Sequence, residues 1–469
     1  MNTKALRQKI LDLAIHGKLV PQNPNDEPAS VLLERIRAEK ERLIKEGKIK
    51  KSKKSKATCD KPRYPFQLPE GWVWTTVGEI SKSILYGVSE SAKSKGEYRL
   101  LRITDIQNNF VDWNTVPFTD FDERKASSYL ISDGDILFAR TGATVGKSYL
   151  VKGLKDKAIY ASYLIRVQTF NEILPEYVKY FFESGFYWEQ IQKDSVGIGQ
   201  PNVNGTTLSQ LALPIPPIKE QQRIVIELGS WLNFIDAIDN GKNELRLAIK
   251  QVKSKILDLA IHGKLVPQDP NDEPASELLK RINPKAGIIC DNPRYGKLPK
   301  SWLWTTLGEI SNYGDNKSVA VENIDENEWI LELEDVEKDT ANIIQKSKKK
   351  ERIIKGVRHS FSKGNILYSK LRTYLNKVLI APSDGFCTTE MIAFDANGQI
   401  SNAYIRHVLR SNFFVDYTQQ CGYGVKMPRL STTDARKGLI PLPPINEQHR
   451  IVAKIEELFA QLDKIESSL

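Results

Sequence analysis

The chain has 469 residues, of which 40% are hydrophobic, so it is long enough to bury two cores of ordinary domain size. Its net charge of +10 favours a polyanionic partner, although such an excess of lysine and arginine is common in other proteins too. The charged, periodic start MNTKALRQKILDLAIHGK excludes a secretory signal and a membrane span, so we expect a cytoplasmic protein.

A long repeat dominates the sequence. Residues 9–27, KILDLAIHGKLVPQNPNDE, return at 255–273 as KILDLAIHGKLVPQDPNDE, a match too long to arise by chance. A second block, LPEGWVWTTVGEI from Leu68, returns as LPKSWLWTTLGEI from Leu298. The chain is therefore a tandem duplication, and the constant offset of 230 beyond the second block implies two copies of one fold.

The first copy opens with a predicted helix over about residues 4–16, inside a segment 1–21 that we assign to a helical spacer. A basic flexible linker, 22–63, follows. Its lysine-rich stretch, 45–56, is typical of a disordered chain that contacts phosphates without selectivity.

Each half then contains a domain that mixes strands and helices. In residues 64–216 the runs WVWTTVGEI, YRLLRITDI and GDILFAR have strand character and are broken by Gly and Asp turns. Residues 173–191 are rich in aromatic side chains at helical spacing, a pattern more typical of a core than of base stacking. Residues 295–443 repeat this domain. The predicted fold class is α+β, with two similar domains separated by a long antiparallel two-helix coiled-coil spacer.

The central segment, 217–263, carries the strongest structural signal and opens with the motif PPIxEQxRIV. Apolar residues spaced alternately four and three apart run along it, interrupted by Lys242, which is typical of a coiled-coil seam. About 45 helical residues would form a rod on the order of 65 Å long. The central seam comprises Ile224, Leu228, Trp231, Ile235, Ile238, Leu245, Ile249, Val252, Ile256 and Leu259.

A second linker, 264–294, leads to the second domain, and a C-terminal helix, 444–469, repeats the beginning of the central helix. The N-terminal helix repeats the remainder of it. We therefore expect a circularly permuted two-fold repeat, in which both terminal helices lie on one line and run antiparallel to the central helix. The alternative is that each terminal helix simply covers its own domain. The terminal seam comprises Leu6, Ile10, Leu13, Ile451, Ile455, Leu458, Leu462 and Ile465.

No catalytic or metal-binding motif is evident in the sequence. GATVGKS, residues 142–148, has three residues between its glycines where a phosphate loop needs four. The five histidines lack metal-ligand spacing, and His16 and His262 lie near predicted helix ends, where we expect polar caps. The four cysteines lack C-x-x-C spacing, which argues against a disulfide framework and a zinc site.

The LPxxWxWTTxGEI and PPIxEQxRIV motifs and the KxxILDLAIHGKLVPQ repeat resemble the specificity subunit of type I restriction-modification enzymes, over essentially the whole chain. The resemblance implies that each domain reads one half of a split, asymmetric site in double-stranded DNA. It implies that the helices space the domains and dock two modification subunits. It further implies that this chain is not an enzyme and holds no cofactor. S-adenosylmethionine would then serve the modification subunits and ATP the restriction subunits of the full complex, and Mg²⁺ is likewise implied for the partner subunits.

Two other functions stay open on the residues alone. A self-sufficient DNA nuclease would cleave DNA without partner subunits. A homodimeric DNA-binding scaffold would pair the helical seam between two chains and sediment as a dimer.

Candidate DNA contacts are paired positions at which the scaffold matches but the polar residues differ, because unlike half-sites need different donors and acceptors. Ordinary drift on solvated strands is an alternative of similar weight. Three stretches qualify: LRITDIQNN with LELEDVEKD, FARTGATVGK with YSKLRTYLNK, and GIGQPNVNGTT with GYGVKMPRLSTT. The first domain offers Arg102, Thr104, Gln107, Arg140, Thr141, Thr144, Lys147, Gln200, Asn202 and Asn204. The second offers Glu332, Glu334, Lys370, Arg372, Thr373, Lys377, Lys426 and Arg429.

Overall fold

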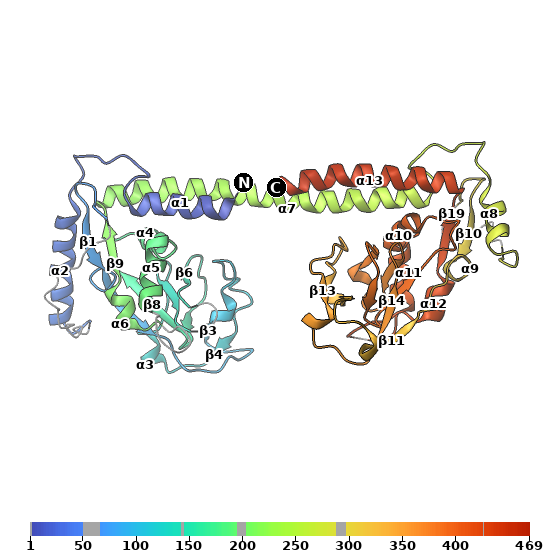
Figure 1. Cartoon of the computed structure of the whole chain (residues 1–469). Helices are drawn as coiled ribbons and strands as arrows, with labels where there is room; N and C mark the ends of the chain where they lie inside the picture. The colour runs from blue at the N-terminus through green and yellow to red at the C-terminus, as the bar shows by residue number, and fades with distance from the viewer. Residues whose placement is uncertain (1, 50–65, 142–144, 195–202, 288–296, 425) are drawn as a thin grey trace. The chain divides into compact units, whose positions relative to one another are not determined.

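A computed structural model describes residues 2–49, 66–141, 145–194, 203–287, 297–424 and 426–469 (Figure 1). The chain divides into two units, Met1–Gly241 and Lys242–Leu469. Each unit has a main hydrophobic core of its own.

The first unit combines three sheets with helices. A four-stranded sheet has the order β2-β8-β5-β6, a three-stranded sheet the order β4-β3-β7, and β1 pairs with β9. The strands are β1 (Val73–Thr76), β2 (Ser81–Tyr86), β3 (Tyr98–Leu101), β4 (Phe118–Thr119), β5 (Ile136–Ala139), β6 (Ser148–Leu150), β7 (Ala158–Tyr160), β8 (Leu164–Thr169) and β9 (Ala212–Ile215). The helices are α1 (Thr3–Ile15), α2 (Ala29–Lys45), α3 (Glu123–Ala126), α4 (Pro175–Phe181), α5 (Gly185–Asp194), α6 (Gly205–Gln210) and α7 (Ile218–Ile261), whose second half belongs to the second unit.

The second unit repeats this plan. Its sheets have the orders β16-β15-β18 and β11-β14-β17-β12-β13, and β10 pairs with β19. The strands are β10 (Leu303–Thr306), β11 (Ser318–Ala320), β12 (Trp329–Leu331), β13 (Ser347–Lys348), β14 (Val357–Phe361), β15 (Ile366–Ser369), β16 (Val378–Ile380), β17 (Gly385–Cys387), β18 (Met391–Phe394) and β19 (Leu439–Leu442). The helices are α8 (Ala275–Ile282), α9 (Leu307–Ile310), α10 (Asn402–Arg410), α11 (Asn412–Cys421), α12 (Thr432–Lys437) and α13 (Ile445–Ser467).

The central strand of each unit has the same register. Ile136 of β5 lies opposite Val167 of β8, and Ile366 of β15 lies opposite Phe394 of β18. Successive side chains of a strand face opposite ways, so two neighbouring residues show what covers the two faces of each central sheet. Ile136 and Ile366 belong to the main cores, whereas the next residues, Leu137 and Leu367, belong to smaller cores on the other face. Sheets covered on both faces hold their strand ends rigidly for the loops that follow.

The aromatic residues at helical spacing are core residues, as predicted. Tyr177 and Phe181 of α4 and Tyr187 of α5 are fully buried. The Tyr177 hydroxyl donates to the carbonyl of Pro214 (2.8 Å), and in the second unit the Tyr404 hydroxyl donates to that of Pro441 (2.7 Å). These hydroxyl groups satisfy carbonyls of β9 and β19 that would otherwise cost free energy inside the core.

Helix α7 pairs antiparallel with a partner helix in each unit (Figure 1). In the first unit Arg7, near the start of α1, forms an ion pair with Asp236. In the second unit Lys253 of α7 binds Asp463 of α13 (2.5 Å), and Gln268, beyond the end of α7, binds Glu447 at the start of α13. The predicted antiparallel pairing of α7 and α13 is confirmed.

The predicted seam is only partly buried. Its exposed members are Trp231, Ile238, Leu245, Val252 and Ile465, and its buried members are Ile10, Ile224, Leu228, Ile235, Ile249, Ile256, Ile451 and Ile455. The half-buried members are Leu6, Leu13, Leu259, Leu458 and Leu462. Leu232, one residue outside the stripe, is buried in the same core as Tyr177 and Phe181. Helix α7 therefore packs on the domain helices as well as on α1, and its buried face departs from a strict two-helix seam.

The repeated motifs contact each other, which explains why they occur together. In the first unit Gln22 of the long repeat donates to Glu220 of the EQxRIV motif (3.1 Å), and Arg223 binds Asp26 (2.8 Å). In the second unit Gln268 and Asp272 bind Glu447 and Arg450 in the same way, the last pair at 2.6 Å. We call these contacts the polar clamp of each unit. Since Asp26 and Asp272 are buried, their arginine partners offset the cost of burying a charge.

Both segments expected as linkers contain a helix. In 22–63, helix α2 buries Leu32, Leu33 and Ile36 in the main core, and in 264–294 helix α8 buries Leu278 and Leu279. An apolar helical face outweighs the polar composition of these segments. The rest of the lysine-rich stretch, from residue 50 onward, lies outside the described residues.

Candidate functional site

The second and third candidate stretches meet at the end of the central strand in each unit. The N–H of Val203 donates to the carbonyl of Arg140 (3.1 Å), and the N–H of Leu430 donates to that of Lys370 (2.9 Å). Arg140 directly follows β5, and Lys370 directly follows β15. Side chains in loops that a rigid sheet holds in place are the usual means of recognition. The two stretches therefore form one surface in each unit, which we call the strand-end surface.

The loop after β15 has an unusual backbone. Arg372 and Asn376 have φ angles of 51° and 55°, in the left-handed region that residues other than glycine rarely adopt. Arg372 is fixed there because its N–H donates to the carbonyl of Pro428 (2.8 Å). The Nε of Arg372 is buried and has no hydrogen-bond partner among the described residues. Conformations of this kind cost free energy and tend to occur at binding sites.

Polar and aromatic groups surround this loop. The Thr418 hydroxyl donates to that of Thr373 (2.8 Å), while Tyr374 and Tyr423 are exposed. Beside them lies a pocket of about 240 Å³. It is lined by Thr373, Tyr374, Thr418, Gln419, Gly422, Pro428 and Arg429.

Charged side chains of the second unit differ in their hydrogen-bond partners and in their exposure. Arg429 forms a two-bond ion pair with Glu390, and Lys426 is exposed. Lys377 donates to the carbonyl of Leu333 (2.7 Å), and burial lowers the pKa of its ammonium group. This contact joins the first candidate stretch to the second.

Within that first stretch, Glu332 and Glu334 have different surroundings. Glu332 binds Arg358 (2.8 Å) and has 20% of its side chain exposed. Glu334 has 85% of its side chain exposed and lies 3.8 Å from Arg352. Glu334 is thus the more accessible carboxylate.

In the first unit the matching stretch is held by its own turn. Arg102 binds Asp105 through two nitrogens (2.6 and 3.0 Å), which caps the short turn Ile103–Asp105. Thr104 is exposed, and the Gln107 amide donates to the Thr104 carbonyl (2.8 Å). Arg102 would have to exchange this partner in order to contact a base, whereas Thr104 is already accessible.

The strand-end surface of the first unit is described in part. The Arg140 guanidinium lies 4.9 Å from the centre of the Tyr86 ring, and its Nε is buried with no hydrogen-bond partner in the described ranges. Thr141 is half-buried and Lys147 is exposed. Asn204 caps α6 by accepting the N–H of Thr207 (2.9 Å). Three further candidates, Thr144, Gln200 and Asn202, lie outside the described residues.

Sequence reasoning missed two residues of these surfaces. Glu390 lies directly before β18 and Tyr163 directly before β8. The carbonyl of Tyr163 accepts the N–H of Arg140 (3.2 Å), and that of Glu390 accepts the N–H of Lys370 (3.0 Å), so the two residues occupy equivalent places. The signal was present, because an aromatic residue is exchanged for a carboxylate immediately before two matching strands.

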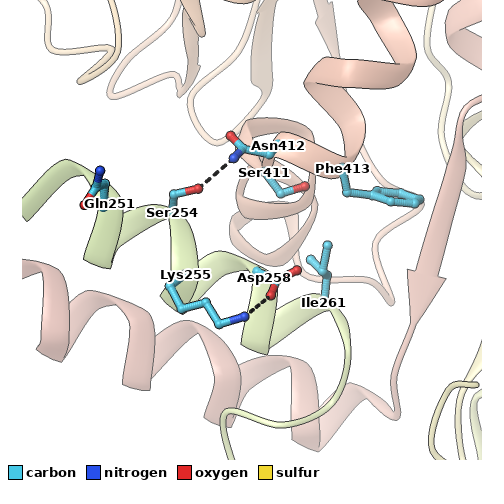
Figure 2. A pocket seen from close by; sticks show the side chains of 8 residues that line it. All are labelled: Gln251, Ser254, Lys255, Asp258, Ile261, Ser411, Asn412 and Phe413. Carbon is cyan, nitrogen blue, oxygen red and sulfur yellow. Dashed lines mark hydrogen bonds and ion pairs between the residues drawn. The ribbon is translucent and has the colours of Figure 1, made fainter. Parts of the chain in front are cut away.

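The pocket in Figure 2 belongs to helix packing. It encloses about 320 Å³ where α11 begins beside α7. The Asn412 amide donates to the Ser254 hydroxyl (2.9 Å), and Lys255 pairs with Asp258 one turn along α7 (2.7 Å). In the described part of the chain, no group of three or more His, Cys, Asp or Glu side chains is placed to hold a metal ion.

Comparison with protein families decides which class of protein carries these surfaces. The model of the type I restriction modification DNA specificity domain matches residues 69–247 and again residues 299–468. The chain belongs to this family. It is a DNA specificity subunit of a type I restriction-modification system, the recognition component and not a catalytic one.

Two relatives match this specificity subunit along nearly its whole length. The type I restriction enzyme EcoAI specificity subunit of Escherichia coli is 29% identical over 541 residues, covering 98% of this chain and 90% of the relative. The EcoEI specificity subunit of Escherichia coli is 29% identical over 552 residues, covering 99% and 90%.

A solved structure also resembles this specificity subunit. It comes from work on the complex assembly and conformational transition of the type I R-M system, with a TM-score of 0.56 and 18% identity, covering 86% of this chain and 94% of the other. The likeness concerns the fold, and the predicted α+β fold is confirmed. Across the described ranges, we find no helix with the length and apolar character that a membrane crossing needs.

Proposed function

We propose that residues 64–216 and 295–443 of this specificity subunit each read one half of a bipartite, asymmetric site in double-stranded DNA. The supporting observation is that two strand-end surfaces with the same backbone connections carry different side chains. Arg140 and Tyr163 stand in one unit where Lys370 and Glu390 stand in the other. Different donors and acceptors on one framework suit two unlike base sequences.

The contacts that we propose divide into two kinds. Exposed lysines such as Lys147 and Lys426 suit phosphates, which position a protein without reading sequence. Accessible groups with defined hydrogen-bonding edges, such as Thr104 and Arg429, suit base edges. The remaining candidates are Arg102, Gln107, Arg140, Thr141, Thr144, Gln200, Asn202, Asn204, Glu332, Glu334, Lys370, Arg372, Thr373 and Lys377.

We further propose that the long helices set the number of base pairs between the half-sites and dock two modification subunits. Helix α7 has 44 residues, equivalent to a length of about 66 Å. It exposes large apolar side chains, including Ile226 (73%), Phe234 (63%) and Leu247 (58%). Trp231, also exposed, lies beside Phe234 with the ring centres 6.5 Å apart, and adjoining exposed apolar side chains are typical of a surface that a partner covers. Restriction subunits would join the full complex in the cytoplasm, and S-adenosylmethionine, ATP and Mg²⁺ would serve the partner subunits.

Methylation sequencing tests the proposal directly. The full chain is co-expressed with its modification subunits, and the methylated motif is read from genomic DNA. We expect two defined half-sites separated by a fixed number of unspecified base pairs. Exchanging residues 64–213 for those of a relative should change one half-site and leave the other intact. A change in both halves, or in neither, would contradict the assignment.

The purified chain provides the second test. Incubated with DNA, divalent metal, S-adenosylmethionine and ATP, it should neither methylate nor cleave DNA until partner subunits are added. Cleavage by the chain alone would favour a nuclease. Sedimentation as a dimer would favour the homodimeric scaffold.

A further inference from the structure

The backbone at Arg429 is fixed by a chain of hydrogen bonds. Its N–H donates to the carbonyl of Tyr423 (2.9 Å), and its carbonyl accepts the N–H of Tyr423 (3.0 Å). The next residue, Leu430, donates to Lys370 (2.9 Å), which in turn donates to Glu390 (3.0 Å). Arg429 is therefore tied to the end of β15 and the beginning of β18, both of which belong to the central sheet.

The side chain of Arg429 is held along one edge by Glu390. Its Nε donates to Oε2 (3.1 Å) and its Nη2 donates to Oε1 (2.8 Å). A guanidinium has five N–H groups, and these bonds use two of them. The end formed by Nη1 and the second N–H of Nη2 has no hydrogen-bond partner within the described ranges, and 44% of the side chain is exposed. A pair of parallel donors thus remains accessible.

We propose that Arg429 reads a guanine in the second half-site and that Glu390 is its positioning residue. Guanine presents two acceptors, O6 and N7, in the major groove, and their spacing matches two parallel N–H groups of an arginine. The inference rests on the proposed function, since it requires that residues 295–443 contact DNA bases.

A base contact fits Arg429 better than a phosphate contact. A guanidinium paired with a carboxylate carries no net charge, so it gains little from the polyanionic backbone. The same pairing holds the guanidinium plane in one orientation, which a two-bond contact requires. Glu390 has 25% of its side chain exposed, so the pair is partly shielded from water.

The first unit carries different residues at the matching positions. Tyr163, which is 60% exposed, occupies the place of Glu390. The sequence match of Arg429 is Asn202, which lies outside the described residues. A tyrosine cannot hold a guanidinium as a carboxylate does, and an asparagine amide pairs best with adenine. The guanine contact is accordingly specific to the second half-site.

Methylation sequencing of variants tests the inference. The full chain, co-expressed with its modification subunits, is compared as wild type, Arg429→Lys and Glu390→Gln. Arg429→Lys keeps the charge but removes the fork, so it should reduce the preference for guanine at one position by about ten- to a hundredfold. Glu390→Gln should relax the same position by a smaller factor, because the fork stays but its orientation is freer.

Arg281→Lys is the matched control. Arg281 of α8 is as exposed as Arg429 (47% and 44% of the side chain) and forms a two-bond pair with Glu273 (2.6 and 2.9 Å). Its Nε also donates to Gln399 (2.6 Å). The Arg281→Lys variant should leave the methylated motif unchanged. Thermal unfolding should show that all the variants fold.

The outcomes separate the inference from the proposed function. A wild-type complex without a bipartite motif would overturn both. A bipartite motif without guanine in the second half-site would overturn only the guanine contact, as would an Arg429→Lys variant that methylates all sites equally weakly. A Glu390→Gln variant with full discrimination would show that Glu390 does not position Arg429.

Discussion

His407 provides a direct test of the packing in the second unit. It lies on α10 with 2% of its surface exposed, and its ring meets that of Phe459 on α13 edge-on at 6.2 Å. Neither ring nitrogen has a hydrogen-bond partner among the described residues. Burial, reinforced by the charges of Arg406 and Arg410, holds the pKa of His407 well below its usual value of 6.5. The folded state therefore keeps this ring neutral.

The substitution His407→Phe should remove a pH-dependent loss of stability. Below pH 6.5 the unfolded chain binds a proton at this histidine, whereas the folded chain does not. The contribution of the neutral His407 ring to the free energy of unfolding is therefore fully present above pH 6.5. It is lost as the pH falls toward the folded pKa, by about 1.4 kcal/mol per pH unit. Phenylalanine abolishes this slope. The substitution also removes two unpaired polar atoms from the core. At pH 7.5 we therefore expect the free energy of unfolding to rise by about 1–3 kcal/mol.

Urea unfolding of the full chain at pH 7.5, 6.5 and 5.5 measures the effect, and hydrogen exchange of α10 assigns the transition to the second unit. His449→Gln is the control, because His449 is exposed and the first half has Gln222 at the matching position. If wild type and His407→Phe lose stability in parallel as the pH falls, the neutral buried ring is refuted. A variant less stable than wild type at pH 7.5 would show that the ring makes favourable polar contacts.

Three further changes test other parts of the molecule. Asp272→Asn removes the partner of Arg450, which holds the pKa of Asp272 below its usual value, so urea unfolding should show a loss of about 1–3 kcal/mol at neutral pH that disappears in acid. An equal loss at both pH values would contradict this. Gly263→Ala places a methyl group 2.4 Å from Pro299 at a φ of +65°. It should lower stability more than Gly356→Ala, where φ is +83° but no described residue lies within 4 Å of the added methyl group. Equal melting temperatures would contradict the clash. One heptad inserted into α7 lengthens it by about 10 Å and should add about three base pairs between unchanged half-sites in methylation sequencing. An unchanged spacing would show that α7 does not set it.

The duplicated sequence made the repetition of the fold predictable. Matching runs such as GDILFAR and GNILYSK become β5 and β15 in equivalent sheets. Periodicity also identified the long helices, because an apolar repeat sustained over many turns is typical of a helix that packs along its length. It did not show which side of α7 is buried, since in the first unit the core that contains Tyr177 and Phe181 of α4 also includes residues of α7. Trp231 is exposed and Leu232 is buried for this reason.

The strand-end surfaces were harder to predict because they join residues that are distant in sequence. Arg429 lies beside Glu390 through a contact that only the folded sheet creates. The same is true of the polar clamp, where Gln22 lies beside Glu220. The polar composition of 22–63 predicted a flexible linker, whereas the structure has helix α2 there. The apolar face of α2 at Leu32 and Ile36 precedes a lysine-rich stretch that dominates the local charge. In each case the sequence identifies residue types correctly, but the partner of each side chain depends on tertiary packing.

The polar clamp gives the doubled sequence a physical reason. Each unit needs one copy of the long repeat and one copy of the EQxRIV motif, because a buried aspartate of the first binds an arginine of the second. In the first unit the repeat comes from the N-terminal end of the chain, and in the second the EQxRIV motif comes from the C-terminal end. An unpaired buried carboxylate would be costly, so neither motif can change without the other. The strand-end surfaces are connected through backbone hydrogen bonds, so Tyr163 and Glu390 can differ in their side chains on the same backbone connections. Under the proposed function, this division would let the framework stay the same while each unit reads a different DNA sequence.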